Sequence, residues 1–132
     1  MGMKSFGVGI SVNNIMEAVE FYKSALGMEL GDTDHFPENH PNCGECMHAE
    51  MWKSGKQIFA IQGQNEKQRD FDPEKQIINF GAYFNTKEEL REAFELLSDG
   101  GIVKEPFGTV VDWSPCCATV IDKYGITWWI SI

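Results

Sequence analysis

Hydrophobic and polar residues alternate strictly over residues 5–12. A period of two residues predicts a strand with one buried face. The apolar face carries Phe6, Val8, Ile10 and Val12, whereas the other face carries only serine and glycine. Such a bare face leaves room either for a ligand or for a closely packed aromatic side chain from another strand.

The hydrophobic period becomes helical over residues 13–27 and again over residues 85–100. Apolar side chains recur there at three and four positions, as in a helix that packs one face on a core. Asn14 and Thr86 are the predicted N-caps, each with a glutamate three residues later as in a capping box. A glycine ends each helix.

The two halves of the chain end in related sequences. Lys53 and Gly55 correspond to Lys123 and Gly125, each 70 positions later, and an apolar run follows each glycine. Residues 47–53 and 57–62 predict a hairpin around Ser54-Gly55, with the matching turn in the second half at Tyr124-Gly125. This register places Glu50 opposite Phe59, His48 opposite Ile61 and, in the second hairpin, Val120 opposite Trp129.

The remaining segments set the expected domain organisation. Residues 31–46 are rich in Gly, Asp, Asn and Pro and predict a long loop, and the polar residues 64–76 predict a linker. We therefore expect an α+β fold in which residues 1–132 form one domain of two repeated modules, 1–63 and 77–132. Each module is a strand, a helix and three strands, and the two form a curved mixed sheet around a cleft.

The predicted cleft combines aromatic walls with a few polar groups, which is typical of a small-molecule pocket. His48 could serve as a general base or an oriented donor, with Glu50 on the same face to tune it; the alternative is a structural, half-buried histidine. Trp113 either caps the cleft or belongs to the core. The side chains expected to face the cleft are Cys46, His48, Glu50, Trp52 and Phe59 in the first module and Cys116, Val120 and Trp129 in the second.

Composition excludes several classes of partner. The 132-residue chain has a net charge of −9 and no run of Lys or Arg, which argues against nucleic acid and against anionic membranes. No apolar stretch approaches the roughly 18–20 residues of a membrane-spanning helix, and the N-terminus lacks the apolar core of a signal peptide. We expect a cytoplasmic protein with free thiols.

The cysteines allow three interpretations. Cys43, Cys46 and His48, with Cys116 or Cys117 as a fourth ligand, would complete a zinc site. Adjacent cysteines on a strand point to opposite faces, however, and a redox dithiol works at a helix N-terminus rather than before a strand. We favour the third interpretation, in which the cysteines are ordinary thiols near the mouth of a pocket.

Four stretches carry a resemblance to a known family. Residues 21–30 (FYKSALGMEL), residues 48–50 (HAE), Trp113 and residues 122–128 (DKYGITW) resemble the PhnB-like branch of the vicinal oxygen chelate superfamily. That superfamily includes glyoxalases, bleomycin-resistance proteins and extradiol dioxygenases. The resemblance covers essentially the whole chain and implies the glyoxalase/bleomycin-resistance fold.

The resemblance also implies four metal-ligand positions in the metal-dependent families. Counting along the chain places Gly7, Asn79, Phe59 and Trp129 at them. Glycine and the aromatic residues cannot ligate a divalent ion, so we expect neither a metal nor another cofactor. The demethylubiquinone methyl transfer ascribed to this branch is also unsupported, since no Gly-rich cofactor fingerprint follows a strand and opens a helix.

Two functions follow from the sequence. The first is a metal-independent small-molecule binding or sequestering protein. The alternative is an enzyme of lyase, isomerase or transferase type that acts on a small metabolite through His48 and Glu50, with or without a divalent metal. We also expect a homodimer, because the last strand is apolar on both faces, with Trp128, Trp129, Ile130 and Ile132.

Overall fold

The computed structural model describes residues 2–63 and 72–132. The chain divides into two compact units, Met1–Gln68 and Arg69–Ile132. Their boundary falls inside the predicted linker 64–76, most of which lies outside the described residues. Its described end forms the short 3₁₀ helix η1 (Pro73–Lys75), which Asp72 caps by accepting a hydrogen bond from the Glu74 amide.

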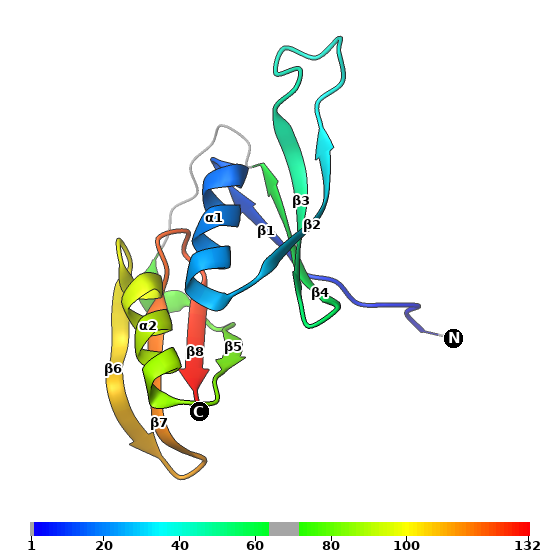
Figure 1. Ribbon diagram of the computed structural model, residues 1–132. Coiled ribbons are helices and arrows are strands. Elements are labelled where there is room, and N and C mark those ends of the chain that lie inside the picture. The colour runs from blue at the N-terminus through cyan, green and yellow to red at the C-terminus, as the bar shows by residue number, and fades with distance from the viewer. Residues whose placement is uncertain (1, 64–71) are drawn as a thin grey trace. The chain divides into compact units, whose positions relative to one another are not determined.

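The N-terminal unit is a mixed sheet of four strands with one helix on it (Figure 1). Strands β1 and β4 are parallel neighbours, and β4, β3 and β2 continue the sheet with antiparallel pairing. The elements, in chain order, are β1 (Gly9–Val12), α1 (Ile15–Leu26), β2 (Glu29–His35), β3 (Cys46–Lys53) and β4 (Lys56–Gly63).

The C-terminal unit repeats this topology. Its strand order is β5-β8-β7-β6, again with one parallel pair, β5 and β8. The elements are β5 (Phe80–Tyr83), α2 (Lys87–Ser98), β6 (Ile102–Val111), β7 (Ser114–Ile121) and β8 (Thr127–Ser131). The prediction of an α+β fold with two strand–helix–three-strand modules is therefore confirmed.

Both predicted helix caps are present. The Asn14 side chain accepts a hydrogen bond from the Glu17 amide at 3.1 Å, and the Thr86 hydroxyl accepts one from the Glu89 amide at 3.2 Å. Gly27 ends α1 in the left-handed region, with φ 64°. These caps satisfy amides that would otherwise lack partners, and so they set where each helix begins.

Each helix covers one face of its own sheet and forms a core with it. In the N-terminal unit the core is made of α1 side chains and the strand residues that alternate toward them. In the C-terminal unit Trp128 and Ile130 of β8 lie on the α2 side. The buried residues of α1 are Ile15, Ala18, Val19, Tyr22 and Ala25, and those of α2 are Leu90, Ala93 and Leu97.

The predicted loop 31–46 is too long, because its first residues belong to a strand. Residues up to His35 belong to β2, which pairs with β3 despite its polar sequence, and the connecting loop is 36–45. An edge strand tolerates this composition because polar side chains and irregular pairing discourage association with other strands. Its pairing with β3 shifts register at Leu30/Thr33 and again at Asp34/His35.

Next to the first turn the predicted register is confirmed, with Lys53 opposite Lys56 and Trp52 opposite Gln57. Farther along the first hairpin, and in the second hairpin, it is wrong by one residue. A shift of register between Met51 and Trp52 places Phe59 opposite Met51, so that Glu50 pairs with Ala60 and His48 with Gln62. In the second hairpin Trp129 pairs with Thr119, and Val120 pairs with Trp128. Because side chains alternate between faces, a one-residue slip moves Phe59 to the other side of the sheet.

In the described part of the chain, neither α1 nor α2 is long and apolar enough to span a bilayer.

Candidate functional site

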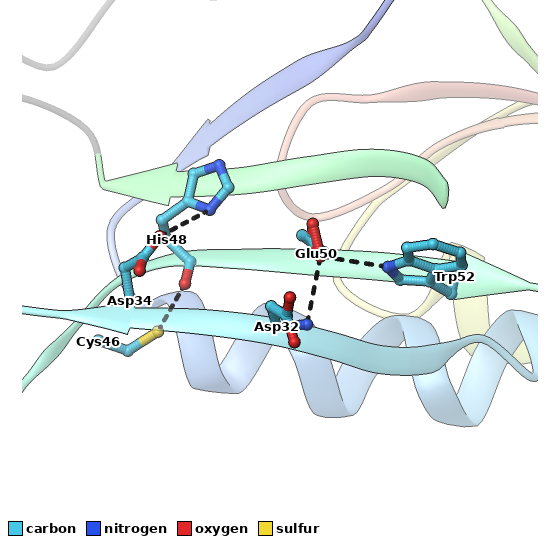
Figure 2. Close-up of polar contacts among 6 residues, drawn as sticks. All are labelled: Asp32, Asp34, Cys46, His48, Glu50 and Trp52. Carbon is cyan, nitrogen blue, oxygen red and sulfur yellow. Dashed lines mark hydrogen bonds and ion pairs between the residues drawn. The ribbon is translucent and has the colours of Figure 1, made fainter. Parts of the chain in front are cut away.

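The N-terminal sheet has a polar face on the side away from α1. Its defining residues come from β1, β3 and β4 at positions that alternate with the buried core residues. We call this surface the polar face, and it consists of Ser11, His48, Glu50, Trp52 and Gln62. Figure 2 shows His48, Glu50 and Trp52 along β3, with α1 behind the sheet.

The Glu50 carboxylate is held by two N–H groups. Its Oε1 atom accepts a hydrogen bond from the Asp32 amide at 3.3 Å and another from Trp52 Nε1 at 3.4 Å (Figure 2). Asp32 lies on β2, so the carboxylate links two strands. The sequence predicted that Glu50 would tune His48, but its hydrogen bonds orient it toward Trp52 instead.

Gly31 makes the position of Trp52 sterically possible. A Cβ atom at Gly31 would clash with the indole nitrogen and with Cδ1 of Trp52. The indole therefore lies against the bare backbone of β2, within reach of Glu50. A glycine in a strand often marks such a close approach.

His48 has an acidic neighbour that the sequence analysis did not identify. Asp34 is its direct partner across the β2–β3 pair, and its Oδ2 atom lies 3.8 Å from His48 Nδ1. Because this carboxylate faces Nδ1, Nε2 is the ring nitrogen left for a ligand. Asp34 was missed because it falls in the segment predicted to be a loop.

Gln62 and Ser11 complete the polar face on β4 and β1. Gln62 Nε2 donates a hydrogen bond to the Ser11 hydroxyl at 3.2 Å, across the parallel pair of strands. The alternation of residues 5–12 already indicated that Ser11 lies on the uncovered side. Gln62 was not among the predicted cleft residues, because the predicted register placed Ile61 opposite His48.

Phe59 does not belong to the polar face. Its side chain is 1% exposed and lies edge-on to the Tyr22 ring of α1, with ring centroids 5.2 Å apart. The prediction that it shares a face with His48 and Glu50 is wrong, because the register shift at Met51/Trp52 turns it toward the helix.

The C-terminal residues predicted to share one face lie on both faces of their sheet. Trp129 lies opposite Gly81 and edge-on to the Tyr83 ring, whereas Cys116 is buried on the alternate side with Ala118. The physical reason is the length of the turn, since Ile121 rather than Asp122 pairs with Thr127.

Trp113 lies at the turn between β6 and β7. Its side chain is 75% exposed, so the interpretation of Trp113 as a core residue is wrong. The alternative, that it caps a ligand site, stays a prediction.

The cysteines are free thiols in different environments. Cys43 is exposed, Cys46 is half-buried, and Cys116 and Cys117 are buried. Burial raises the pKa of the Cys117 thiol, and the nearby Glu105 carboxylate raises it further. A thiol that stays protonated is a poor nucleophile and a poor metal ligand. Within residues 2–63 and 72–132, no group of three or more His, Cys, Asp or Glu residues could hold a metal ion.

The superfamily's metal also does not fit the strands that would supply its ligands. On the polar face, β1 and β4 offer Gly9, Ser11, Ala60 and Gln62, with Ala60 at the place to which the sequence analysis assigned Phe59. Hydroxyl and amide groups are poor substitutes for the imidazoles and carboxylates of a divalent-metal site.

Known structures share this fold. A PhnB protein from Bacillus cereus superposes with a TM-score of 0.78 at 23% identity, over 97% of this chain and 98% of that chain. A Pseudomonas aeruginosa protein gives 0.73 at 20% identity, over 96% and 97% of the two chains. The fosfomycin resistance protein FosX from Listeria monocytogenes, in complex with Mn(II) and dihydroxypropylphosphonic acid, gives 0.67 at 12% identity, over 98% and 93%.

Sequence comparison identifies the family. No curated protein matches the chain. A family profile described as 3-demethylubiquinone-9 3-methyltransferase matches residues 10–131, which is nearly the whole sequence. The chain therefore belongs to this PhnB-like family, and it shares its fold with structures described as a PhnB protein and a possible glyoxalase, both from Bacillus cereus.

Proposed function

We propose that this protein is a metal-independent small-molecule binding or sequestering protein whose ligand contacts the polar face of the N-terminal sheet. The observation that carries the proposal is the fixed geometry of Glu50 and Trp52. A carboxylate held by two N–H donors beside an ordered indole combines one charged group with one aromatic surface. Few, well-placed polar groups beside an aromatic side chain are what small-ligand sites require.

The ligand can be sought directly. The purified protein is mixed with a metabolite extract and analysed by native mass spectrometry, with metal analysis of the same sample. The proposal expects a bound organic molecule whose signal is lost when Trp52 is replaced. Retention of a stoichiometric divalent ion together with the ligand would contradict metal independence.

An enzyme is the second candidate, and the His48–Asp34 pair favours it. An imidazole with a carboxylate at one nitrogen can take up a proton at the other, which suits general acid–base chemistry on a lyase or isomerase substrate. The methyl transfer in the name of the family needs a methyl donor site, for which the chain has no Gly-rich fingerprint.

Replacement of His48 by glutamine separates the two candidates. For a binding protein we expect the Kd of the identified ligand to change by no more than about threefold, since a neutral side chain of similar size keeps most contacts. Isothermal titration measures the Kd, and an assay of ligand consumption measures turnover. Turnover by the wild type that His48→Gln abolishes, with binding intact, would establish the enzyme instead.

We further propose that the protein acts in the cytoplasm as a homodimer. Strand β5 forms one edge of the C-terminal sheet and has exposed apolar side chains on it and just before it, at Ile77, Ile78 and Tyr83. Exposed apolar residues beside a sheet edge favour association with a second chain. The α2 helix already covers Trp128 and Ile130, so the apolar last strand contributes less to this argument than the sequence suggested.

Sedimentation equilibrium at micromolar concentration tests the assembly. We expect a mass of twice the 14.9 kDa of one chain. Aspartate at both Ile77 and Ile78 should shift the protein to monomer, because it places charges in the proposed contact, whereas aspartate at the exposed Met16 of α1 should not. A wild-type mass of one chain would refute the dimer.

A further inference from the structure

We propose that the polar face selects ligands with a positively charged nitrogen, an organic ammonium group that contacts both the Glu50 carboxylate and the ring face of Trp52. This inference rests on the proposed function and names the chemical class of its ligand. It concerns only the N-terminal unit.

The first argument is that Glu50 forms no ion pair with a cationic side chain among the described residues. Its described partners are a backbone amide and an indole N–H, both neutral, and among the described residues no Lys or Arg forms an ion pair with it. The neighbouring Lys53 is engaged elsewhere, since its ammonium group donates to the Gly27 carbonyl at 2.9 Å. A half-buried carboxylate without a cation gains most from a ligand that brings one.

The second argument is the unequal use of the two carboxylate oxygens. Both described hydrogen bonds go to Oε1, which leaves Oε2 available as an acceptor. The two donors also restrain the position of Oε1, which reduces the side-chain entropy that is lost when a ligand binds. The group is thus oriented before the ligand arrives.

The third argument is the indole beside the carboxylate. Trp52 is half-buried, and its nitrogen is directed to Glu50 while Gly31 lets the ring lie on β2. Tryptophan is the aromatic side chain that attracts cations most strongly. The indole N–H edge is directed at Glu50, so an ammonium group would lie over the face of the ring, where it makes a cation–π contact with Trp52 and an ionic contact with Oε2 of Glu50.

The fourth argument is that the surrounding charge disfavours anions. Asp34 lies on the same strand pair, and the other members of the polar face are a hydroxyl, an amide and an imidazole. The protein's net charge of −9 adds a long-range field that attracts cations. A phosphate or carboxylate ligand would meet no Lys or Arg among the five residues that define this face.

Binding of model compounds tests the class of ligand. The probes are benzyltrimethylammonium, neutral benzyl alcohol and anionic benzoate, titrated into ¹⁵N-labelled full-length protein. The indole N–H signal of Trp52, assigned with Trp52→Phe, and the amide signal of Asp32 report on the site. We expect saturable shifts of both with the ammonium compound and at least about tenfold weaker binding of the other two.

Two variants localise the interaction. Glu50→Gln keeps an oxygen that can accept both hydrogen bonds but removes the charge, and it should weaken ammonium binding about three- to tenfold. Gly31→Ala keeps the charge but displaces the indole, and it should weaken binding by a similar factor. The matched control is Glu38→Gln in the exposed 36–45 loop, which makes the same change of net charge and should alter the Kd by less than about twofold.

The outcomes separate this inference from the proposed function. If benzyl alcohol or benzoate binds this face as tightly as the ammonium compound, or if Glu50→Gln binds it unchanged, the ammonium class is wrong while the binding site stands. If neither these probes nor the ligand from the metabolite extract shifts the two signals, both proposals fail. The spectra themselves show whether each variant is folded.

Discussion

Replacement of Asp122 by alanine should lower the free energy of unfolding of the C-terminal unit by about 2–4 kcal/mol. Asp122 is 3% exposed, and its carboxylate accepts hydrogen bonds from the Tyr124 amide at 2.9 Å, the Ile126 amide at 3.1 Å and Trp128 Nε1 at 2.9 Å. Alanine leaves these donors without their acceptor, and Trp128 is itself 2% exposed. A buried donor without a partner costs more than the bond contributed.

Urea unfolding and hydrogen exchange of the β7 and β8 amides measure this effect. Asp122→Asn separates the contributions, because its oxygen can still accept from the backbone while its amide group opposes Trp128 Nε1, and it should cost less than alanine. Asp72→Ala is the matched control, since Asp72 also accepts a backbone hydrogen bond but lies exposed before η1. A cost of Asp122→Ala no larger than that of Asp72→Ala would contradict the argument.

Asp122 also explains where prediction from sequence failed in the second hairpin. A two-residue turn at Tyr124-Gly125 was inferred from the glycine and from the 70-residue offset. The structure has a longer turn. Its Tyr124 and Ile126 amides donate to the Asp122 side chain instead of to a backbone carbonyl of the neighbouring strand. Hydrophobic periodicity contains no information on such side-chain caps, and so the register slipped by one residue.

The helices and the module order could be predicted because their signals are local. Asn14 and Thr86 bond to amides three residues away, and the apolar periods decide which face each helix buries. The extent of strand β2 could not be predicted, because residues 31–35 are polar and form a strand only through pairing with β3. The long-range contact, rather than the propensity of its residues, determines its structure.

The candidate site was predicted only in part, because some of its contacts are local and others depend on long-range strand pairing. His48 and Glu50 are two residues apart on one strand, so alternation alone places them on one face. Their partners come from β2. The place of Asp34 opposite His48, and the hydrogen bond from the Asp32 amide to the Glu50 carboxylate, both depend on register shifts within that strand. Neither the spacing nor the composition of residues 31–35 indicates where those shifts fall.

The family name and the site lead to different chemistry. The family profile that matches the chain is named after a methyl transfer. The FosX structure, which has a similar fold, contains Mn(II), but at 12% identity its similarity to this chain shows the fold alone. The polar face of the N-terminal sheet offers a carboxylate, an indole and an imidazole rather than a metal-ligand set. Function is decided by such groups and not by the fold that carries them.

Replacement of Phe59 by alanine tests whether this residue belongs to the core or to a ligand site. We expect the free energy of unfolding of the N-terminal unit to fall by about 3–5 kcal/mol, since the ring is 1% exposed and packs against Tyr22. Hydrogen exchange of the β3 and β4 amides reports on this unit, and urea unfolding gives the total. Phe59→Leu fills more of the space and should cost less.

The adjacent Ile58 provides the control for Phe59. It lies on the same strand and is 43% exposed. Its replacement by alanine should lower the free energy of unfolding by less than about 1 kcal/mol. If Phe59→Leu kept full stability but lost the ligand found by mass spectrometry, Phe59 would line the ligand site and its assignment to the core would be wrong. If the large cost appears for Phe59→Ala alone and Phe59→Leu keeps the ligand, Phe59 belongs to the core, and Trp52 is the tryptophan of the polar face that the ligand-binding proposal uses.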